Sequence, residues 1–264
     1  MNTTVVVVGG GPAGLVLGLL LARQGVEVTV LEKHADFLRD FRGDTVHSST
    51  LELLDELGLG EKIDQLPGRK VGGLHVTFDD GTYTVADFTR LPGAHPYLMF
   101  LPQWDFLELL AREAAALPTF TLLRSTKVTG VLRAADGTVT GVTADGPDGQ
   151  IEVRARLTVA CDGRDSVVRD ELGLRPVDYA APMDVLWFRI SRIPADGDGL
   201  DMRIGAGGRC CASIAATTSS ARTSSPRAAT TRYAPRACRR CGTTWRGGRP
   251  SSPAELASWC RGRT

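Results

Sequence analysis

Residues 3–14, Thr-Thr-Val-Val-Val-Val-Gly-Gly-Gly-Pro-Ala-Gly, decide the fold of this 264-residue chain. Residues 3–8 form a continuous β-branched run, which is typical of a strand buried on both faces of a parallel sheet. The glycine-rich stretch follows at once, and residues 15–24 then predict a buried helix closed by a glycine. Residues 26–31 predict a second strand, with Glu32 at its end. The sequence therefore predicts a β-α-β unit with a glycine-rich loop.

The loop carries Gly9, Gly11 and Gly14 in the spacing G-x-G-x-x-G, with Pro12 and Ala13 before the last glycine. Gly9 allows a tight turn, Gly11 lets the backbone approach a pyrophosphate, and Gly14 lets helix and strand pack closely. The N-terminus of the helix attracts the charge of a phosphate. This pattern predicts a dinucleotide-binding site.

Glu32 follows Gly14 by 18 residues, where a carboxylate can accept hydrogen bonds from a ribose 2′-OH. A 2′-phosphate would meet a like charge there, which argues against NADP in this site. The alternative is a glycine-rich turn in an unrelated α/β protein. The register of strand, loop, helix and acid favours the dinucleotide.

The sequence up to residue 182 then predicts hairpins in place of further β-α-β repeats. The expected elements are helices at residues 50–57 and 106–116 (N-cap Asp105), hairpins at 71–88 and 128–144, a strand at 151–160 and a short helix opening at Ser166. An α/β, Rossmann-type domain interrupted by antiparallel hairpins is not the pattern of a simple NAD dehydrogenase.

Four segments together resemble the flavin-dependent aromatic hydroxylases, the single-component FAD monooxygenases typified by para-hydroxybenzoate hydroxylase. They are GGGPAG with Glu32, FRGDTVHSSTLELLDELGL at 41–59, FLPQWDFLELLARE at 100–113 and VACDGRDSVVRDELGL at 159–174. The resemblance covers residues 3–205 and is to the N-terminal portion of that family.

The resemblance implies that the glycine loop and Glu32 bind the ADP half of FAD. It also implies that Arg42 lies near the FAD, that Gln103 contacts the flavin nucleotide, and that Asp162 and Gly163 lie near the pyrophosphate. The Asp-Gly pair is further associated with the use of NAD(P)H, which such enzymes bind transiently. The alternatives are a solvated loop arginine for Arg42 and a helix N-cap or turn residue for Asp162.

The implied activity is hydroxylation of an aromatic or polyketide-like small molecule with NAD(P)H and O₂. The alternatives are an FAD-dependent reductase or halogenase of the same fold, and a non-catalytic nucleotide-binding fragment. Residues 1–208 contain no Ser-His-Asp order and no metal-ligand cluster, and no residue is assigned to catalysis. The oligomeric state is left open.

Charge and hydropathy exclude several classes of protein. Residues 1–208 carry 20 Lys and Arg against 29 Asp and Glu, which gives no reason to expect nucleic acid. The start, Met-Asn-Thr-Thr, lacks the basic region of a secretory signal. The longest apolar run, residues 15–22, is too short to cross a bilayer. These features predict a cytoplasmic protein.

Residues 209–264 are a different kind of sequence, with 11 Arg against one acid and five of the six cysteines. A basic nucleic-acid-binding arm, or a zinc site using Cys238-x-x-Cys241 with Cys210, Cys211 or Cys260, would be the functional interpretations. The hydrophobic pattern has no helix or strand period, however. Because Ala, Arg, Ser, Thr, Gly, Pro and Cys result when a GC-rich gene is read out of frame, we favour a frameshift near residue 208.

The expected domains follow from this hypothesis. Residues 1–182 form the FAD-binding domain, although inserted strands near 71–100 belong to the substrate domain. Residues 183–208 begin a truncated mixed-sheet substrate domain, and residues 209–264 are a disordered tail. The strand at 183–193 would then lack its partners, and the family's downstream Gly-Asp flavin motif has no counterpart. We therefore expect this chain to fold poorly and to hold FAD weakly.

Overall fold

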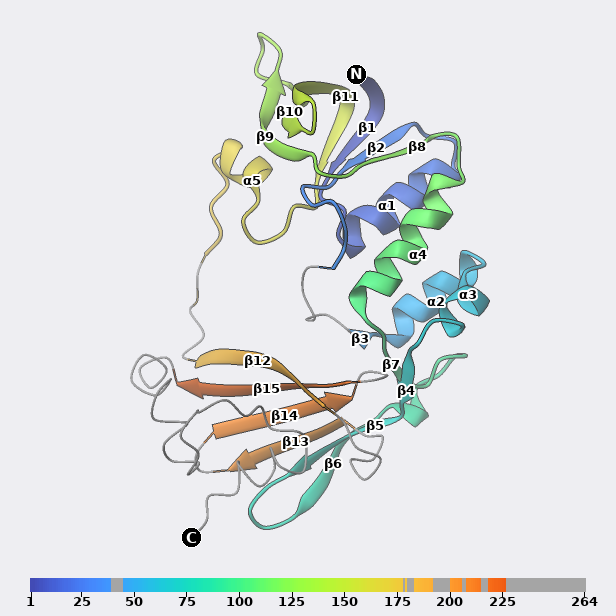
Figure 1. The fold of residues 1–264 in the computed structure, drawn as a ribbon, viewed down its shortest axis with the longest axis vertical. Coiled ribbons are helices and arrows are strands. Elements are labelled where there is room, and N and C mark those ends of the chain that lie inside the picture. The colour runs from blue at the N-terminus through green and yellow to red at the C-terminus, as the bar shows by residue number, and fades with distance from the viewer. Residues whose placement is uncertain are drawn as a thin grey trace. The chain divides into compact units, whose positions relative to one another are not determined.

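The structure is a computed structural model that describes residues 1–38, 45–177, 179, 183–191, 200–205, 208–214 and 218–226. The chain divides into two compact units (Figure 1). Unit 1 comprises residues 1–40 and 104–178, and unit 2 comprises residues 41–103 and 179–264. Unit 2 therefore begins earlier in the chain than the inserted region near residues 71–100 expected from the sequence.

Unit 1 is built on a six-stranded sheet in the order β8-β2-β1-β11-β10-β9. Strands β8, β2, β1 and β11 are parallel, whereas β10 and β9 continue the sheet in antiparallel fashion. The elements of this part are β1 (Asn2–Val8), α1 (Pro12–Arg23), β2 (Val28–Leu31), α4 (Gln103–Ala115), β8 (Phe120–Leu123), β9 (Lys127–Arg133), β10 (Val139–Gly146), β11 (Gly149–Ala160) and α5 (Val167–Glu171).

The β-α-β unit predicted from the first 32 residues is confirmed. The four consecutive valines at the end of β1, residues 5–8, are all buried, as a strand covered on both faces requires. Gly18 lets α1 approach the sheet, because a side chain there would lie within 3.0 Å of Val30 on β2 and Phe120 on β8. The helix thus covers β2 and β8 closely.

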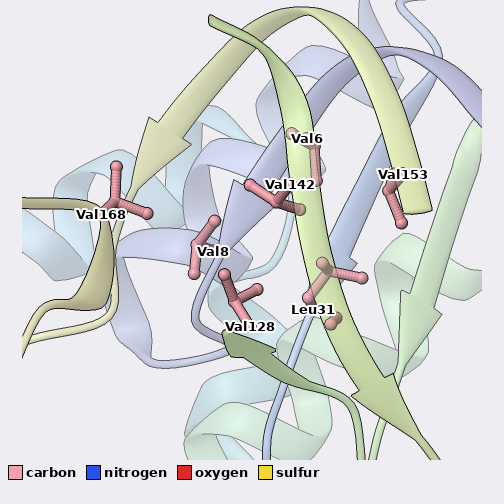
Figure 2. Close-up of a cluster of buried hydrophobic side chains, with 8 residues drawn as sticks. Val6, Val8, Leu31, Val128, Val142, Val153 and Val168 are labelled. Carbon is pink, nitrogen blue, oxygen red and sulfur yellow. The ribbon is translucent and has the colours of Figure 1, made fainter. Parts of the chain in front are cut away.

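In unit 1, side chains of the antiparallel strands β9 and β10 pack against side chains of the parallel strands. The C-terminal part of β11 pairs with β1, and its N-terminal part pairs with β10. The two pairings meet at Arg154 of β11. Arg154 lies opposite Gly141 of β10, and Gly141 has a φ of +147°. Figure 2 shows how side chains from β1, β2, β9, β10, β11 and α5 then share one core; these are Val6, Val8, Leu31, Val128, Val142, Val153 and Val168.

Two sequence-based element boundaries differ from the structure. Helix α4 begins at Gln103, directly after Pro102, so Asp105 lies in its first turn and is not its N-cap. Proline suits this position because its fixed φ and missing N–H cost nothing at a helix start. The hairpin expected at residues 71–88 differs at its start, since residues 69–71 and 73–77 form separate strands that belong to different sheets.

Unit 2 contains two sheets. A three-stranded sheet has the order β3-β7-β4, and a six-stranded sheet has the order β12-β15-β14-β13-β5-β6. The elements are β3 (Thr45–Val46), α2 (Ser48–Glu56), α3 (Gly60–Asp64), β4 (Arg69–Val71), β5 (Gly73–Thr77), β6 (Thr82–Asp87), the 3₁₀ turn η1 (Phe88–Arg90), β7 (Leu98–Phe100), β12 (Met183–Ser191), β13 (Leu200–Gly205), β14 (Gly208–Ile214) and β15 (Thr218–Pro226).

Strands β14 and β15 differ from the expectation of a disordered tail beginning at residue 209. Strand β15 pairs with β12 along its whole length, from Met183 opposite Pro226 to Ser191 opposite Thr218. The partner strands of β12 are therefore not missing, although β12 remains at the sheet edge. Pairing uses backbone groups, so a Ser- and Thr-rich segment can pair without a hydrophobic period. Residues 227–264 of the expected tail lie outside the described residues.

No helix in the described part of the chain is both long enough and apolar enough to cross a membrane.

Candidate cofactor-binding site

The carboxyl ends of three parallel strands bring the glycine loop, Glu32 and the Cys-Asp-Gly segment to one edge of the sheet. Val8, the last residue of β1, is paired with Leu31 of β2 and with Ala160 of β11. The next residue of each strand is therefore Gly9, Glu32 or Cys161. In open α/β sheets, ligands bind at this edge.

Two glycines make the close contacts of the loop. Gly9 has a φ of +104°, and a side chain there would overlap the carbonyl group of Cys161. A side chain on Gly14 would overlap the carbonyl oxygen of Gly9 and lie 3.3 Å from Val7 of β1. The N–H of Gly9 donates to the carbonyl of Leu31 at 2.8 Å. Packing within the chain therefore requires both glycines.

Gly11 differs, because no described atom beyond its two neighbours in the chain lies within 4 Å of the position where its Cβ would be. Its backbone is extended, with a φ of −76°, so an alanine would fit without strain. Gly11 is the N-cap of α1, and Pro12 and Ala13 follow as exposed residues of the first turn. This turn contains no acid and receives no side-chain cap. The open space beside Gly11 thus faces the positive end of the helix dipole.

Glu32 is 3% exposed and connects β2 to the loop. Its Oε2 atom accepts from the N–H of Gly10 at 3.0 Å, and its Oε1 atom accepts from the N–H of His34 at 2.9 Å. A side chain on Gly10 would come within 2.9 Å of the Glu32 Cβ. A carboxylate oxygen has more than one acceptor site, so these bonds leave capacity for a ribose hydroxyl.

Asp162 has one carboxylate oxygen that is used and one that is not. Its Oδ2 atom accepts from the N–H groups of Val167 at 2.8 Å and Val168 at 3.4 Å, at the start of α5. Ser166 caps the same short helix by accepting from Arg169 at 3.0 Å. Within the described residues, Oδ1 of Asp162 is buried without a hydrogen-bond partner. Gly163 follows with a φ of +83° and open space where its Cβ would be.

The thiol of Cys161 is unsuited to reaction as a thiolate. Burial raises the pKa of this thiol, and the charge of Asp162 raises it further. This environment suits Cys161 as a small hydrophobic residue of the strand end.

Arg124 is a cation that no sequence motif indicated. It follows β8 and makes a bidentate ion pair with Glu108, in which each guanidinium N–H donates to one carboxylate oxygen at 2.8 Å. Its guanidinium lies 4.4 Å from the centre of the Phe37 ring. The hydrogen bond to Glu108 raises the pKa of Arg124, and the nearby charges of Asp36 and Glu32 contribute in the same direction. Because β8 was not expected, neither was a cation at its end.

Two other predicted flavin contacts belong to unit 2. Arg42 lies outside the described residues. Gln103 is half-buried and is the first residue of α4. Strands β3 and β7 are antiparallel, with Thr45 opposite Phe100. The start of β3 and the end of β7 therefore lie at the same end of this ladder. Arg42 precedes β3 by three residues, and Gln103 follows β7 by three residues.

The comparison with protein families agrees with this geometry. The model of the FAD binding domain matches residues 2–207, which is most of the chain. The chain belongs to the FAD-binding domain family.

Two relatives named as monooxygenases are similar to this chain over most of its length. The chain is 38% identical over 192 residues to 6-methylpretetramide 4-monooxygenase of Streptomyces rimosus, a match that covers 72% of this chain and 46% of the relative. It is 38% identical over 171 residues to the rifampicin monooxygenase of Streptomyces venezuelae, a match that covers 64% and 34% respectively. The chain thus spans less than half the length of these two relatives.

Two solved structures share the fold of this chain. OxyS anhydrotetracycline hydroxylase from Streptomyces rimosus has a TM-score of 0.69 and 31% identity, over 86% of this chain and 46% of that one. The p-nitrophenol 4-monooxygenase PnpA from Pseudomonas putida has a TM-score of 0.77 over 89% and 62%. Its identity of 23% shows the fold alone.

The residues at the sheet edge fit FAD on two structural grounds. The Gly11 position leaves space that a side chain would fill, at the N-terminus of α1, where a pyrophosphate carries its charge. The buried Oδ1 of Asp162 is an unused acceptor at the same edge, suited to a hydroxyl donor.

Proposed function

We propose that this chain is the cofactor-binding portion of an FAD-dependent monooxygenase that hydroxylates an aromatic or polyketide-like small molecule with NAD(P)H and O₂. Three relatives are named as monooxygenases, of 6-methylpretetramide, of 12-dehydrotetracycline and anhydrotetracycline, and of rifampicin. A relative from Rhodococcus jostii, 34% identical, is named as a probable NADH-specific resorcinol 4-hydroxylase, which supports a nicotinamide co-substrate.

The observation that carries the proposal is the convergence of the open Gly11 position, the buried Glu32 carboxylate and the unpartnered Asp162 oxygen. All three follow parallel strands, and the last residues of β2 and β11 are both paired with Val8, the last residue of β1. Such an edge supplies the three groups that an ADP half requires: a helix N-terminus, a ribose acceptor and a second acceptor.

Each group has a separate task in this proposal. The N–H groups at the start of α1 bind the pyrophosphate, Glu32 accepts from the adenosine ribose, and Asp162 holds a hydroxyl donor near the pyrophosphate. The chemistry that FAD supplies when bound is hydride acceptance from NAD(P)H and activation of O₂. The protein orients the cofactor, and no side chain needs to act as nucleophile. Arg42 and Gln103 are proposed contacts of the flavin half.

The test is O₂ consumption by the purified chain with FAD, NADH or NADPH, and an aromatic polyketide such as anhydrotetracycline. A monooxygenase gives NAD(P)H oxidation that requires O₂ and is stimulated by the polyketide, with one oxygen atom added to the product.

Other outcomes identify the alternatives. Reduction of the organic compound without O₂ uptake would indicate a reductase, and incorporation of chloride would indicate a halogenase. FAD binding without turnover, with activity regained in a chain whose frame is restored after residue 208, would show a non-catalytic fragment of this monooxygenase.

A further inference from the structure

Three polar side chains of unit 2, Asp55, His95 and Tyr97, form a hydrogen-bonded chain that the cofactor site does not use. The Nε2 atom of His95 lies 2.5 Å from Oδ2 of Asp55, and its Nδ1 atom lies 2.8 Å from the hydroxyl of Tyr97. The Lys70 ammonium lies 4.7 Å from the centre of the Tyr97 ring and 3.0 Å from Oδ1 of Asp64. His95 is 7% exposed, so a buried imidazole joins the Asp55 carboxylate to the Tyr97 hydroxyl.

The carboxylate fixes one hydrogen bond of the buried histidine. A carboxylate only accepts, so Nε2 of His95 donates to Asp55. Nδ1 accepts from the Tyr97 hydroxyl when the ring is neutral and donates to it when the ring is protonated. Both ring nitrogens of the buried histidine therefore have a partner. Tyr97 and Asp64 both raise the pKa of Lys70.

The chain ties the segment before β7 to helix α2. Asp55 belongs to α2, whereas His95 and Tyr97 lie immediately before β7. Glu52, one turn before Asp55 on α2, makes a second close approach, because a side chain on Gly93 would overlap its carboxylate. Gly93 has a φ of +101°, so glycine suits this position on both counts.

Strand β7 links the Asp55–His95 contact to Gln103, a proposed flavin contact. It is the central strand of the three-stranded sheet, paired with β3 on one side and β4 on the other. Its N-terminal end follows Tyr97 directly, and its C-terminal end precedes Gln103 by three residues. A shift of β7 along the sheet would therefore move Gln103 with it.

We propose that Asp55 and His95 are positioning residues, which lock β7 in register and thereby place Gln103 for the flavin half of FAD. The assignment of Gln103 rests on the proposed function; the lock itself rests on the contacts described above. A buried polar chain suits this task, because it is satisfied in one arrangement and costly in any other.

The experiment compares Asp55→Ala with Asp80→Ala as the matched control. Asp55 accepts from a buried histidine, whereas Asp80 accepts from the exposed Tyr83 hydroxyl at 3.3 Å in the β5–β6 hairpin. Asp55→Asn is the conservative variant, since its amide oxygen can still accept from His95. Two quantities are measured for each protein: the affinities for FAD and for ADP, and the hydrogen exchange of residues 98–107.

In Asp55→Ala we expect the FAD affinity to fall by about tenfold, as for loss of one hydrogen bond. The ADP affinity stays unchanged, because ADP meets only the glycine loop and Glu32. Exchange across residues 98–107 becomes faster, and Asp55→Asn recovers much of both effects. A general structural defect would weaken FAD and ADP binding equally.

Equal FAD affinity in Asp55→Ala and Asp80→Ala, or equal loss of FAD and ADP, overturns the positioning role. If Asp55→Ala does not fold, Asp55→Asn is compared with Asp80→Ala by the same criteria. If the unmodified chain binds no FAD, the proposed function and the role of Gln103 fail together. The hydrogen-exchange comparison then tests by itself whether Asp55 and His95 hold β7 in register. Equal exchange in the two alanine variants would overturn that role.

Discussion

The carboxylate of Glu32 accepts a hydrogen bond from the backbone N–H of Gly10 at 3.0 Å, and this bond joins the end of β2 to the glycine loop. The acid at this position therefore shapes the loop that receives the phosphate, in addition to its proposed task at the ribose. The second oxygen holds the N–H of His34 at 2.9 Å. The buried Glu32 side chain thus fixes the backbone of Gly10 in the glycine loop and the backbone of His34 after β2.

Glu32→Gln is expected to destabilise the fold. A glutamine has one acceptor oxygen for the two N–H donors of Gly10 and His34, and its NH₂ group would face the other donor. The expected loss is about 1–3 kcal/mol in the free energy of unfolding, measured by urea denaturation. Glu27→Gln, at an exposed position, is the control. An equal effect of both substitutions would contradict the structural role of Glu32.

Gly9→Ala and Gly14→Ala are each expected to lower stability by about 1–3 kcal/mol. The new methyl group would overlap the carbonyl of Cys161 in the first variant and the carbonyl oxygen of Gly9 in the second. The first also places an alanine at a φ of +104°. Thermal unfolding followed by circular dichroism measures the effect, and an unchanged Tm in either variant would show that the close packing is wrong.

Asp162→Asn is expected to lower the pKa of the Cys161 thiol, because it removes the charge that opposes the thiolate, while burial continues to raise it. The rate of Cys161 alkylation should therefore increase at a given pH near 8, as read from the peptide that contains this residue. The remaining cysteines, all after residue 208, serve as internal standards. A slower Cys161 reaction in the variant would reverse the assigned sign.

The composition after residue 208 predicts a single-base frameshift in the coding DNA. Sequencing across codons 200–264 and several hundred bases beyond should show one gained or lost base and a second open frame that continues toward family length. If the recorded frame stands unchanged, the basic, cysteine-bearing sequence is a genuine part of the protein and the frameshift hypothesis fails.

The first 32 residues predicted their fold well because their signals are local. A β-branched run, a glycine spacing and an acid at a strand end each act through neighbouring residues, and all three appear in the structure where expected. Ser166 likewise opened a helix as its type and position indicated.

The pairing of strands that lie far apart in the chain could not be predicted from the sequence. Strand β7 has only three residues and β3 has two, so neither shows a period, and their sheet depends on partners far along the chain. The register of β14 and β15 with β12 is equally non-local. The carboxylate of Asp55 and the ring of His95, forty residues apart, meet only through that folding.

The most direct test of the account is the FAD affinity of Gly11→Ala beside that of the unmodified chain. Gly11 has unstrained backbone and empty space at its Cβ, so the variant should keep the same Tm, unlike Gly9→Ala and Gly14→Ala. We expect weak but saturable FAD binding to the unmodified chain by flavin fluorescence, and a further loss of about tenfold or more in Gly11→Ala, the equivalent of about 1.4 kcal/mol. Equal FAD affinity in the two proteins, or no saturable binding to either, would contradict the proposal that this edge of the sheet holds the cofactor.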